Sequence, residues 1–102
     1  MRRVPAKTEL LNNYPNPFNP ETWIPYQLSG EANVTLTIYD MVGQVVRTIN
    51  AGRQQAAIYV SRDKAIYWDG HNDVGEQVSS GIYFYRLEAG EFFESKKMVI
   101  LK

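Results

Sequence analysis

A run of acidic and polar side chains at residues 69–76 is the part of the sequence that most resembles a site for chemistry. Hard cations such as Ca²⁺ take several oxygen ligands from one loop. The order of residues does not match an EF-hand, because His71 stands where a carboxylate is required and Ser80 takes the place of the twelfth-position glutamate. We therefore expect Asp69 and Asn72 to hydrogen-bond main-chain groups in a long turn. The weak candidates for metal ligands are Asp69, Asn72 and Asp73.

His71 is the single histidine and the only obvious candidate for a general base. A general base needs a nucleophile or substrate proton within hydrogen-bond reach, and the sequence has no Gly-x-Ser-x-Gly nucleophile elbow. The absence of cysteine excludes thiol catalysis, thiolate zinc sites and disulfides. From these observations we expect a protein that is not an enzyme and that has no cofactor.

Seven tyrosines, four phenylalanines and two tryptophans make the chain rich in aromatic side chains. Most of them alternate along expected strands, which favours a place in the core, and Trp68 is expected there. Trp23 falls on the opposite strand face from Ile24 and Tyr26, so it is the best single candidate for an exposed contact residue. Binding of a sugar by stacking is therefore kept as a less favoured alternative.

The overall composition is that of one globular domain. The chain has 102 residues, 44% of them apolar, and its eleven basic residues balance eleven acidic ones. A zero net charge argues against a general nucleic-acid binder, which needs a basic face. No stretch approaches the roughly 20 apolar residues of a membrane span, and the basic start of the chain lacks the apolar segment of a signal peptide.

Hydrophobic residues alternate with polar ones along most of the chain, which predicts strands. Pro25 lies inside the first of these strands and is expected at an edge or bulge. Residues 44–49 fit both a strand and a helical stripe, and the β-branched content favours the strand; residues 51–53 are expected to end it. Gly90 and Glu91 predict a two-residue hairpin. The expected strands are 22–29, 34–39, 44–49, 54–59, 65–68, 76–79, 82–89 and 92–101.

The pattern as a whole predicts an all-β fold, an antiparallel β-sandwich of about seven to nine strands. The side chains expected in its core are Ile24, Tyr26, Leu28, Val34, Leu36, Ile38, Trp68 and Ile82. Residues 12–20 contain four asparagines and three prolines, which exclude a helix and leave little room for a sheet ladder. We expect residues 14–20 to form an ordered loop that Tyr14 and Phe18 attach to the core.

Three blocks of sequence, in this order and spacing, resemble the type A C-terminal sorting domain of type IX secretion cargo and the related immunoglobulin-like domain of the flagellar hook-capping protein. The first is residues 11–20, the second residues 34–48, and the third runs from Trp68 through residues 80–90 to the lysine-rich end. The resemblance covers residues 10–102, and residues 1–9 are expected to be a disordered leader or linker. The family-motif residues are Tyr14, Pro15, Asn16, Pro17, Phe18, Asn19, Trp68, Asp69, Gly70, Gly75, Gly81 and Tyr83.

The resemblance implies an immunoglobulin-like sandwich attached to a larger cargo protein and recognised by the outer-membrane secretion machinery. It implies export through the periplasm, followed by release or attachment at the cell surface. The residues that it marks for recognition are Lys96, Lys97, Met98, Val99, Ile100, Leu101 and Lys102. The final strand, residues 94–102, is expected to be the recognised element, because it ends free and could add to an open edge of the receptor. The alternative is a structural or adhesive immunoglobulin-like module, as the hook-capping relative suggests.

Overall fold

The computed structural model describes residues 4–102, and within them it contains nine β-strands and no helix. The strands are β1 (Glu9–Leu10), β2 (Thr22–Ile24), β3 (Tyr26–Leu28), β4 (Ala32–Tyr39), β5 (Val45–Gln54), β6 (Ala57–Tyr59), β7 (Ile66–Trp68), β8 (Gly81–Ala89) and β9 (Phe92–Ile100). The boundary that we placed at residue 10 stays a prediction; β1 contains Glu9 as well as Leu10. The first three residues of the expected leader lie outside the described residues.

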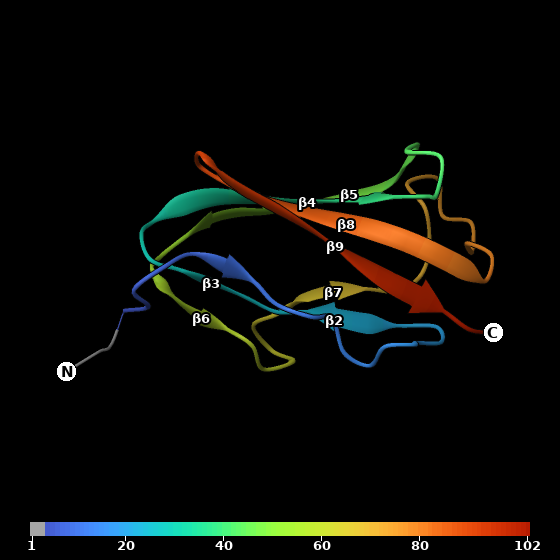
Figure 1. Ribbon diagram of the computed structural model, residues 1–102, viewed down its shortest axis with the longest axis horizontal. Coiled ribbons are helices and arrows are strands. Elements are labelled where there is room, and N and C mark those ends of the chain that lie inside the picture. The colour runs from blue at the N-terminus through green and yellow to red at the C-terminus, as the bar shows by residue number, and fades with distance from the viewer. Residues whose placement is uncertain (1–3) are drawn as a thin grey trace.

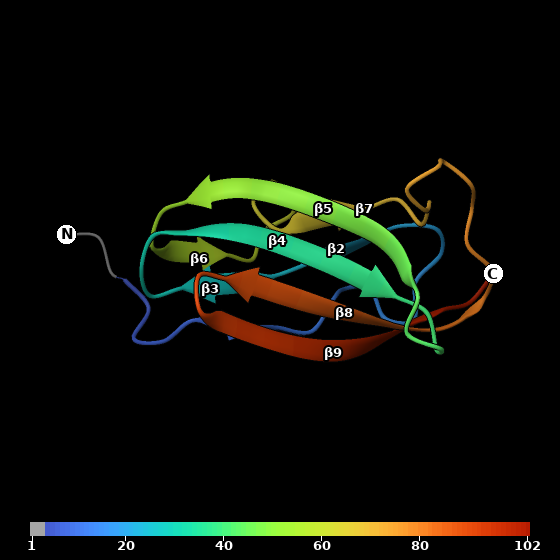
Figure 2. The same ribbon diagram turned by 90° about the horizontal axis from the view of Figure 1, so that it is seen from above.

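The strands form two layers packed face to face (Figure 1). One layer is a four-stranded sheet of order β5-β4-β8-β9, and the other contains the sheets β1-β3-β6 and β2-β7. All pairings within these sheets are antiparallel. Figure 2, which looks down on the four-stranded sheet, shows β5 and β9 as its two edges. The prediction of an all-β immunoglobulin-like sandwich is confirmed.

Pro25 divides the strand that we expected at residues 22–29 into β2 and β3. Proline has no N–H for a ladder, and its carbonyl accepts a hydrogen bond from the N–H of Leu11 at 3.0 Å. On either side of it the chain changes partner, since β2 pairs with β7 and β3 pairs with β1 and β6. The expected irregularity at Pro25 is therefore the point where this layer divides into two small sheets.

The ambiguous segment 44–49 belongs to β5, so the strand interpretation is confirmed. The expectation that residues 51–53 end the strand is wrong, because β5 continues to Gln54 through a bulge. Val34 lies opposite Gly52 while Thr35 lies opposite Asn50, which leaves Ala51 as the extra residue. Gly52 adopts a φ of 80°, a conformation that costs glycine little.

Two further expectations differ from the structure. Residues 76–79 do not form a strand; only an isolated bridge joins Gln77 to His71. The short loop instead carries Val78 into the core, where it is 8% exposed. Ile82 lies on the outer face of β8 and is only half-buried, because Tyr83, Tyr85 and Leu87 face inward. Three consecutive aromatic residues at 83–85 hide which face of this strand is the inner one.

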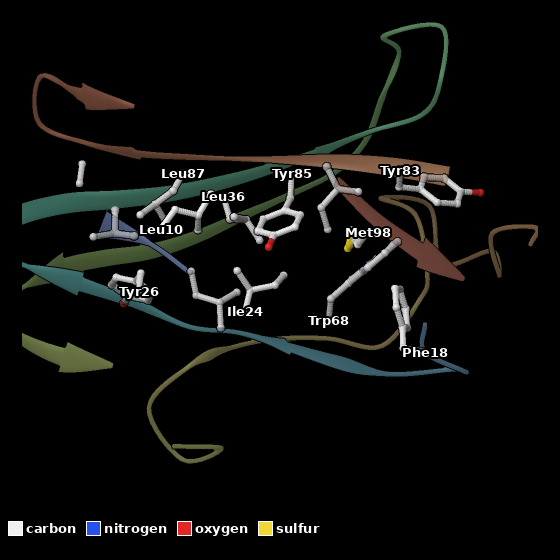
Figure 3. Close-up of a cluster of buried hydrophobic side chains, with 14 of the residues drawn as sticks. Leu10, Phe18, Ile24, Tyr26, Leu36, Trp68, Tyr83, Tyr85, Leu87 and Met98 are labelled. Atoms are coloured by element: carbon white, nitrogen blue, oxygen red, sulfur yellow. The ribbon is translucent and has the colours of Figure 1, made fainter. Parts of the chain in front are cut away.

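The core fills the space between the two layers along their length (Figure 3). Seven of the eight side chains that we expected there are buried, and Trp68, Tyr26 and Tyr85 are the largest of the fully buried ones. Leu36 and Leu87 project from the four-stranded sheet toward Ile24 of the opposite layer. Each large side chain buried in this way contributes roughly 1.5–3 kcal/mol to folding.

Candidate recognition site

β9, the strand that we expected to be recognised, is an edge strand of the four-stranded sheet. It pairs with β8 over its whole length, from Phe92 opposite Ala89 to Ile100 opposite Gly81. Its side chains alternate between the core and the outer face: Met98 and Ile100 are buried, whereas Lys97 is exposed. An edge strand uses half of its main-chain N–H and C=O groups to pair with its one neighbour. The other half, its second row, points away from the sheet and is able to bond to another segment.

The loop of residues 14–20 occupies that second row at the end of β9. Phe18 donates its N–H to the carbonyl of Val99 at 3.0 Å and accepts a hydrogen bond from the N–H of Leu101 at 3.1 Å. The N–H of Val99 donates to Oδ1 of Asn16 at 3.0 Å. The loop thus adds itself to the sheet as a short parallel segment. The end of β9 is already paired on both sides.

The expected recognition residues at the end of the chain are held individually by the domain. Met98 and Ile100 belong to the core. Leu101 is 59% exposed, although its N–H is bound by the loop. Lys102 donates its N–H to Oγ of Ser80 at 3.0 Å and its ammonium group to the carbonyl of Val78. Most polar and apolar groups of this tail are therefore engaged within the domain.

The three lysines of the tail lie in three different environments. Lys96 points to the inner side of β9, where its ammonium nitrogen is 3.8 Å from a carboxylate oxygen of Glu94. Lys97 points to the outer face, and Lys102 is tied to Val78. They do not form one basic patch. An inward-pointing charge pair at the edge of a sheet disfavours pairing with a wholly apolar strand.

Residues of the family motif that are far apart in sequence meet at the end of the sandwich. The ring of Phe18, 2% exposed, packs edge-on against Trp68 with 5.7 Å between ring centroids, and Tyr83 also packs edge-on against Trp68 at 6.2 Å. The indole N–H of Trp68 donates to the carbonyl of His71 at 2.8 Å. The expectation of a packed loop at residues 14–20 is confirmed for Phe18, whereas Tyr14 does not reach the core and stacks instead on Trp23 at the outer face.

Gly70 explains why the motif has glycine directly after Trp68 and Asp69. A Cβ atom at Gly70 would lie 2.6 Å from the carbonyl oxygen of Pro20, and the residue has a φ of +80°. Both observations exclude an unstrained L side chain. The glycine thus lets the turn after β7 touch the proline-rich loop, so that two separate motif blocks form one structural unit.

Tyr85 is a residue of this unit that sequence analysis missed. Its hydroxyl accepts a hydrogen bond from the N–H of Asn13 and donates one to the carbonyl of Leu11, both at 3.0 Å. These bonds satisfy the main chain where it crosses from β1 to the loop. Burial raises the pKa of Tyr85 to about 12, against the opposing effect of the bond to Asn13. The alternation of residues in β8 indicates only weakly that Tyr85 is buried. Nothing in the sequence indicates the hydrogen bonds of its hydroxyl to Asn13 and Leu11.

The side-chain oxygens of residues 69–76 are directed at the main chain. Oδ1 of Asn72 accepts hydrogen bonds from the N–H groups of Val74 and Glu76, and Oδ1 of Asp69 accepts one from His71. Oδ1 of Asp73 accepts one from Thr48 at 3.1 Å. Within residues 4–102 no three histidine or acidic side chains gather as metal ligands would. The interpretation as a hydrogen-bonded turn is confirmed.

Trp23 lies in an aromatic cluster on the outer face of β2 and β7. Its ring is stacked with Tyr14 at 6.2 Å and tilted against Tyr67 at 5.5 Å. The guanidinium of Arg62 lies 4.3 Å above the Trp23 ring. Trp23 is consequently half-buried, and Tyr67, at 47%, is the most exposed ring of the cluster.

A shallow groove of about 450 Å³ opens at the end of the sandwich where β4 turns into β5. Its lining includes Asp40, Val46, Asp73 and Tyr83. Asp40 and Asp73 already accept hydrogen bonds from main-chain N–H groups, Asp40 from Val42 and Gln44 and Asp73 from Thr48.

No helix long and apolar enough to cross a bilayer occurs in the described part of the chain.

Comparison with known proteins identifies a related family and related folds. The family model of the FlgD Ig-like domain matches residues 19–91. No curated protein matches the chain.

Two solved structures share the fold. Dimeric latent PorU from Porphyromonas gingivalis is 21% identical over 92% of this chain, with a TM-score of 0.67. PorZ of the same organism, described as an essential bacterial surface component of the type-IX secretion system, is 16% identical over 89%, with a TM-score of 0.57. The chain spans only 9% of PorU and 11% of PorZ.

Proposed function

Because the chain belongs to the family of the FlgD Ig-like domain, we propose that it is a non-catalytic module that directs a larger exported protein across the outer membrane by type IX secretion. Its partners are the secretion machinery of the outer membrane and the cargo protein to which it is covalently joined. The cargo passes through the periplasm and is then released or attached at the cell surface.

One observation carries this proposal. The first and third of the sequence blocks that resemble sorting domains are assembled into a single unit at the end of β9, in which Phe18 contacts Trp68 and Asn16 contacts Val99. Two blocks that are far apart in the sequence therefore converge on the strand that the resemblance marks for recognition. The description of PorZ as part of the type-IX secretion system gives this proposal further support.

The test is an export assay. The whole chain is fused behind a signal peptide and a reporter protein in a bacterium that has type IX secretion, and the reporter is measured in the periplasm, at the surface and in the medium. We expect export in this strain and retention in the periplasm of an isogenic strain without the secretion system. Retention of the reporter in both strains would contradict the proposal.

Charge recognition is tested in the same assay. Lys96→Gln, Lys97→Gln and Lys102→Gln together remove the positive charge of the tail without placing like charges beside Glu94. The matched control neutralises three exposed cations outside β9, namely Lys7, Arg53 and Lys64. Export that falls with the first triple variant alone supports recognition of charge, provided that both variants unfold cooperatively.

The second candidate is a structural or adhesive module that joins neighbouring domains, and the family match itself favours it. It predicts a folded domain that exports nothing yet binds a neighbouring domain of its own protein. Sugar binding is less well supported, because Arg62 covers one face of Trp23 in the aromatic cluster.

A further inference from the structure

The main chain of β9 presents two rows of polar groups, one toward β8 and one away from it. Val99 bonds to Asn16 and Phe18, so its N–H and C=O face away from β8. Main-chain groups in an antiparallel pair alternate in direction from residue to residue. The outward row of β9 therefore consists of Phe93, Ser95, Lys97 and Val99.

Only the last member of that row has a partner. The loop bonds to Val99 and Leu101, whereas no main-chain or side-chain group of the described residues bonds to the outward N–H and C=O of Phe93, Ser95 and Lys97. All three residues are exposed. We call residues 93–97 the open edge. It is bounded by the Gly90–Glu91 hairpin at one end and by the loop at the other.

The opposite edge of the same sheet is protected at the first half of β5. Asp73 donates its N–H to the carbonyl of Val46 and accepts the N–H of Thr48 on its carboxylate. In the same way, the loop protects the end of β9. Three successive outward residues of the open edge thus lack main-chain partners among residues 4–102, on a regular stretch of strand without the bulge that interrupts β5.

We propose that the open edge, and not the tail of residues 98–102, is where β9 takes up an extended strand of a partner protein. The domain demonstrates that this edge accepts such a segment, because the loop already adds to its far end in parallel. A strand opposite residues 93–97 would continue that addition toward the hairpin, with main-chain hydrogen bonds supplying the affinity.

The side chains on the outer face indicate the chemistry of the partner strand. Lys97 is exposed there, and Arg86 lies beside it on β8 with its guanidinium 4.4 Å from the ring of Phe93. Glu88 on β8 is the one acidic group opposite Phe93. On the inner side Lys96 lies 3.8 Å from Glu94, whose carboxylate also accepts the N–H of Leu10 in β1. The face is net positive, so it fits a strand with carboxylates on one side and small apolar residues on the other.

A second copy of the chain fits this edge less well. Two antiparallel β9 strands paired about Ser95 would place the Glu91 of one opposite the Val99 of the other. That position is filled by the loop, which bonds to Val99. A short free strand avoids this collision.

Binding is tested with the soluble domain and a synthetic peptide of seven residues that alternates valine and glutamate, compared with one that alternates valine and lysine. We expect the acidic peptide to slow amide hydrogen exchange at Phe93, Ser95 and Lys97 at least tenfold and to leave Val99 and Leu101 unchanged, because those amides are already bonded. Equal binding of the basic peptide, protection at another edge, or dimerisation of the domain would overturn the proposal.

Ser95→Pro is the decisive variant. It removes only an outward N–H, a substitution that edge strands tolerate, and it leaves the bonds to β8 intact. Ser95→Ala is the matched control, since it keeps the N–H and loses only the hydroxyl. We expect Ser95→Pro to weaken peptide binding at least tenfold relative to Ser95→Ala, with both domains unfolding cooperatively. Equal binding by the two variants would refute the open edge.

This inference rests on the proposed function only for the identity of the partner. Different results would contradict strand binding at the open edge and the role in secretion. Peptide binding at the open edge without export of any reporter would leave the open edge in place and remove the secretion role. Normal export by Ser95→Pro would keep the secretion role and remove the open edge as the place of recognition.

Discussion

The two layers of the sandwich are stabilised in different ways. In the four-stranded sheet, β4, β5, β8 and β9 have eight to ten residues each and pair along most of their length. In the opposite layer the strands have two or three residues. That layer depends on loops, buried aromatic rings and side-chain hydrogen bonds. Long ladders make one layer robust, whereas single side chains determine the stability of the other.

The largest effect is expected from Trp68→Ala, which removes the ring that joins Phe18 to Tyr83. We expect a loss of about 4 kcal/mol in the free energy of unfolding, because a buried tryptophan leaves a cavity. Hydrogen exchange should show β2 and β7 losing protection before β4 and β8. Tyr67→Ala, on the exposed side of the same strand, should cost no more than about 1 kcal/mol. Equal losses for both variants in denaturant titrations would contradict the difference between the layers.

Phe18→Ala is expected to cost about 3 kcal/mol, since the ring is buried against Trp68. It should also release the loop from the end of β9. Amide exchange at Leu101, whose N–H bonds to Phe18, should then accelerate more than exchange at Met98, which bonds to β8. A thermal midpoint unchanged by the substitution would mean that the loop adds nothing to the layer that it closes.

Gly70→Ala should cost about 2 kcal/mol or more, through backbone strain and the close approach to Pro20. Gly75→Ala is the matched control, because its φ of +87° is similar but its Cβ would meet open space. It should cost about 1 kcal/mol from strain alone. The difference between the two midpoints in urea measures the contact between the two motif blocks. Identical midpoints would show that the close approach of Gly70 to Pro20 does not contribute to stability.

Tyr85→Phe is expected to have the smallest effect, about 1–2 kcal/mol, by leaving the N–H of Asn13 and the carbonyl of Leu11 without a partner. The variant should also alter the response to alkali. Burial raises the pKa of Tyr85 to about 12, and burial with the nearby phenol of Tyr59 raises the pKa of Tyr26 to about 12.

Because both phenols titrate near 10 in the unfolded chain, their contribution is complete below pH 10 and is lost as the pH rises toward 12. Tyr85→Phe should therefore lose stability less steeply than the natural chain between pH 10 and 12. Parallel curves of unfolding free energy against pH in this range would contradict the assignment to Tyr85.

The same difference between layers decides how much of the fold follows from the sequence. Alternation in residues 34–39 and 92–100 predicts long strands correctly. In a half-buried strand, apolar side chains point to the core and polar ones to the solvent, so the residue type indicates the face. The short strands are marked by breaks such as Pro25, and their pairing depends on distant residues. Nothing near Asn13 in the sequence indicates that its N–H bonds to the hydroxyl of Tyr85. The three consecutive aromatic residues that follow Ile82 hide the fact that Ile82 lies on the outer face of its strand.

For the candidate site, sequence analysis finds the right strand but gives no information on its edges. The tail lysines are visible in the sequence, yet whether an edge is free depends on which loop lies beside it. The bonds from Phe18 to Val99 and Leu101 join residues about eighty positions apart, and no local pattern encodes them. The open edge at residues 93–97 follows only from the register of the ladder.

The bridge between Phe18 and Ile100 also has a kinetic consequence. Loop closure over so long a segment opposes early formation, and chains dominated by distant contacts fold slowly. A growing chain cannot complete the sandwich until Leu101 has been synthesised. The first strands of the opposite layer therefore lack their contacts with the last strand of the sheet until synthesis reaches that point. Pairing of the loop with the final strand is therefore expected to be a late step of folding.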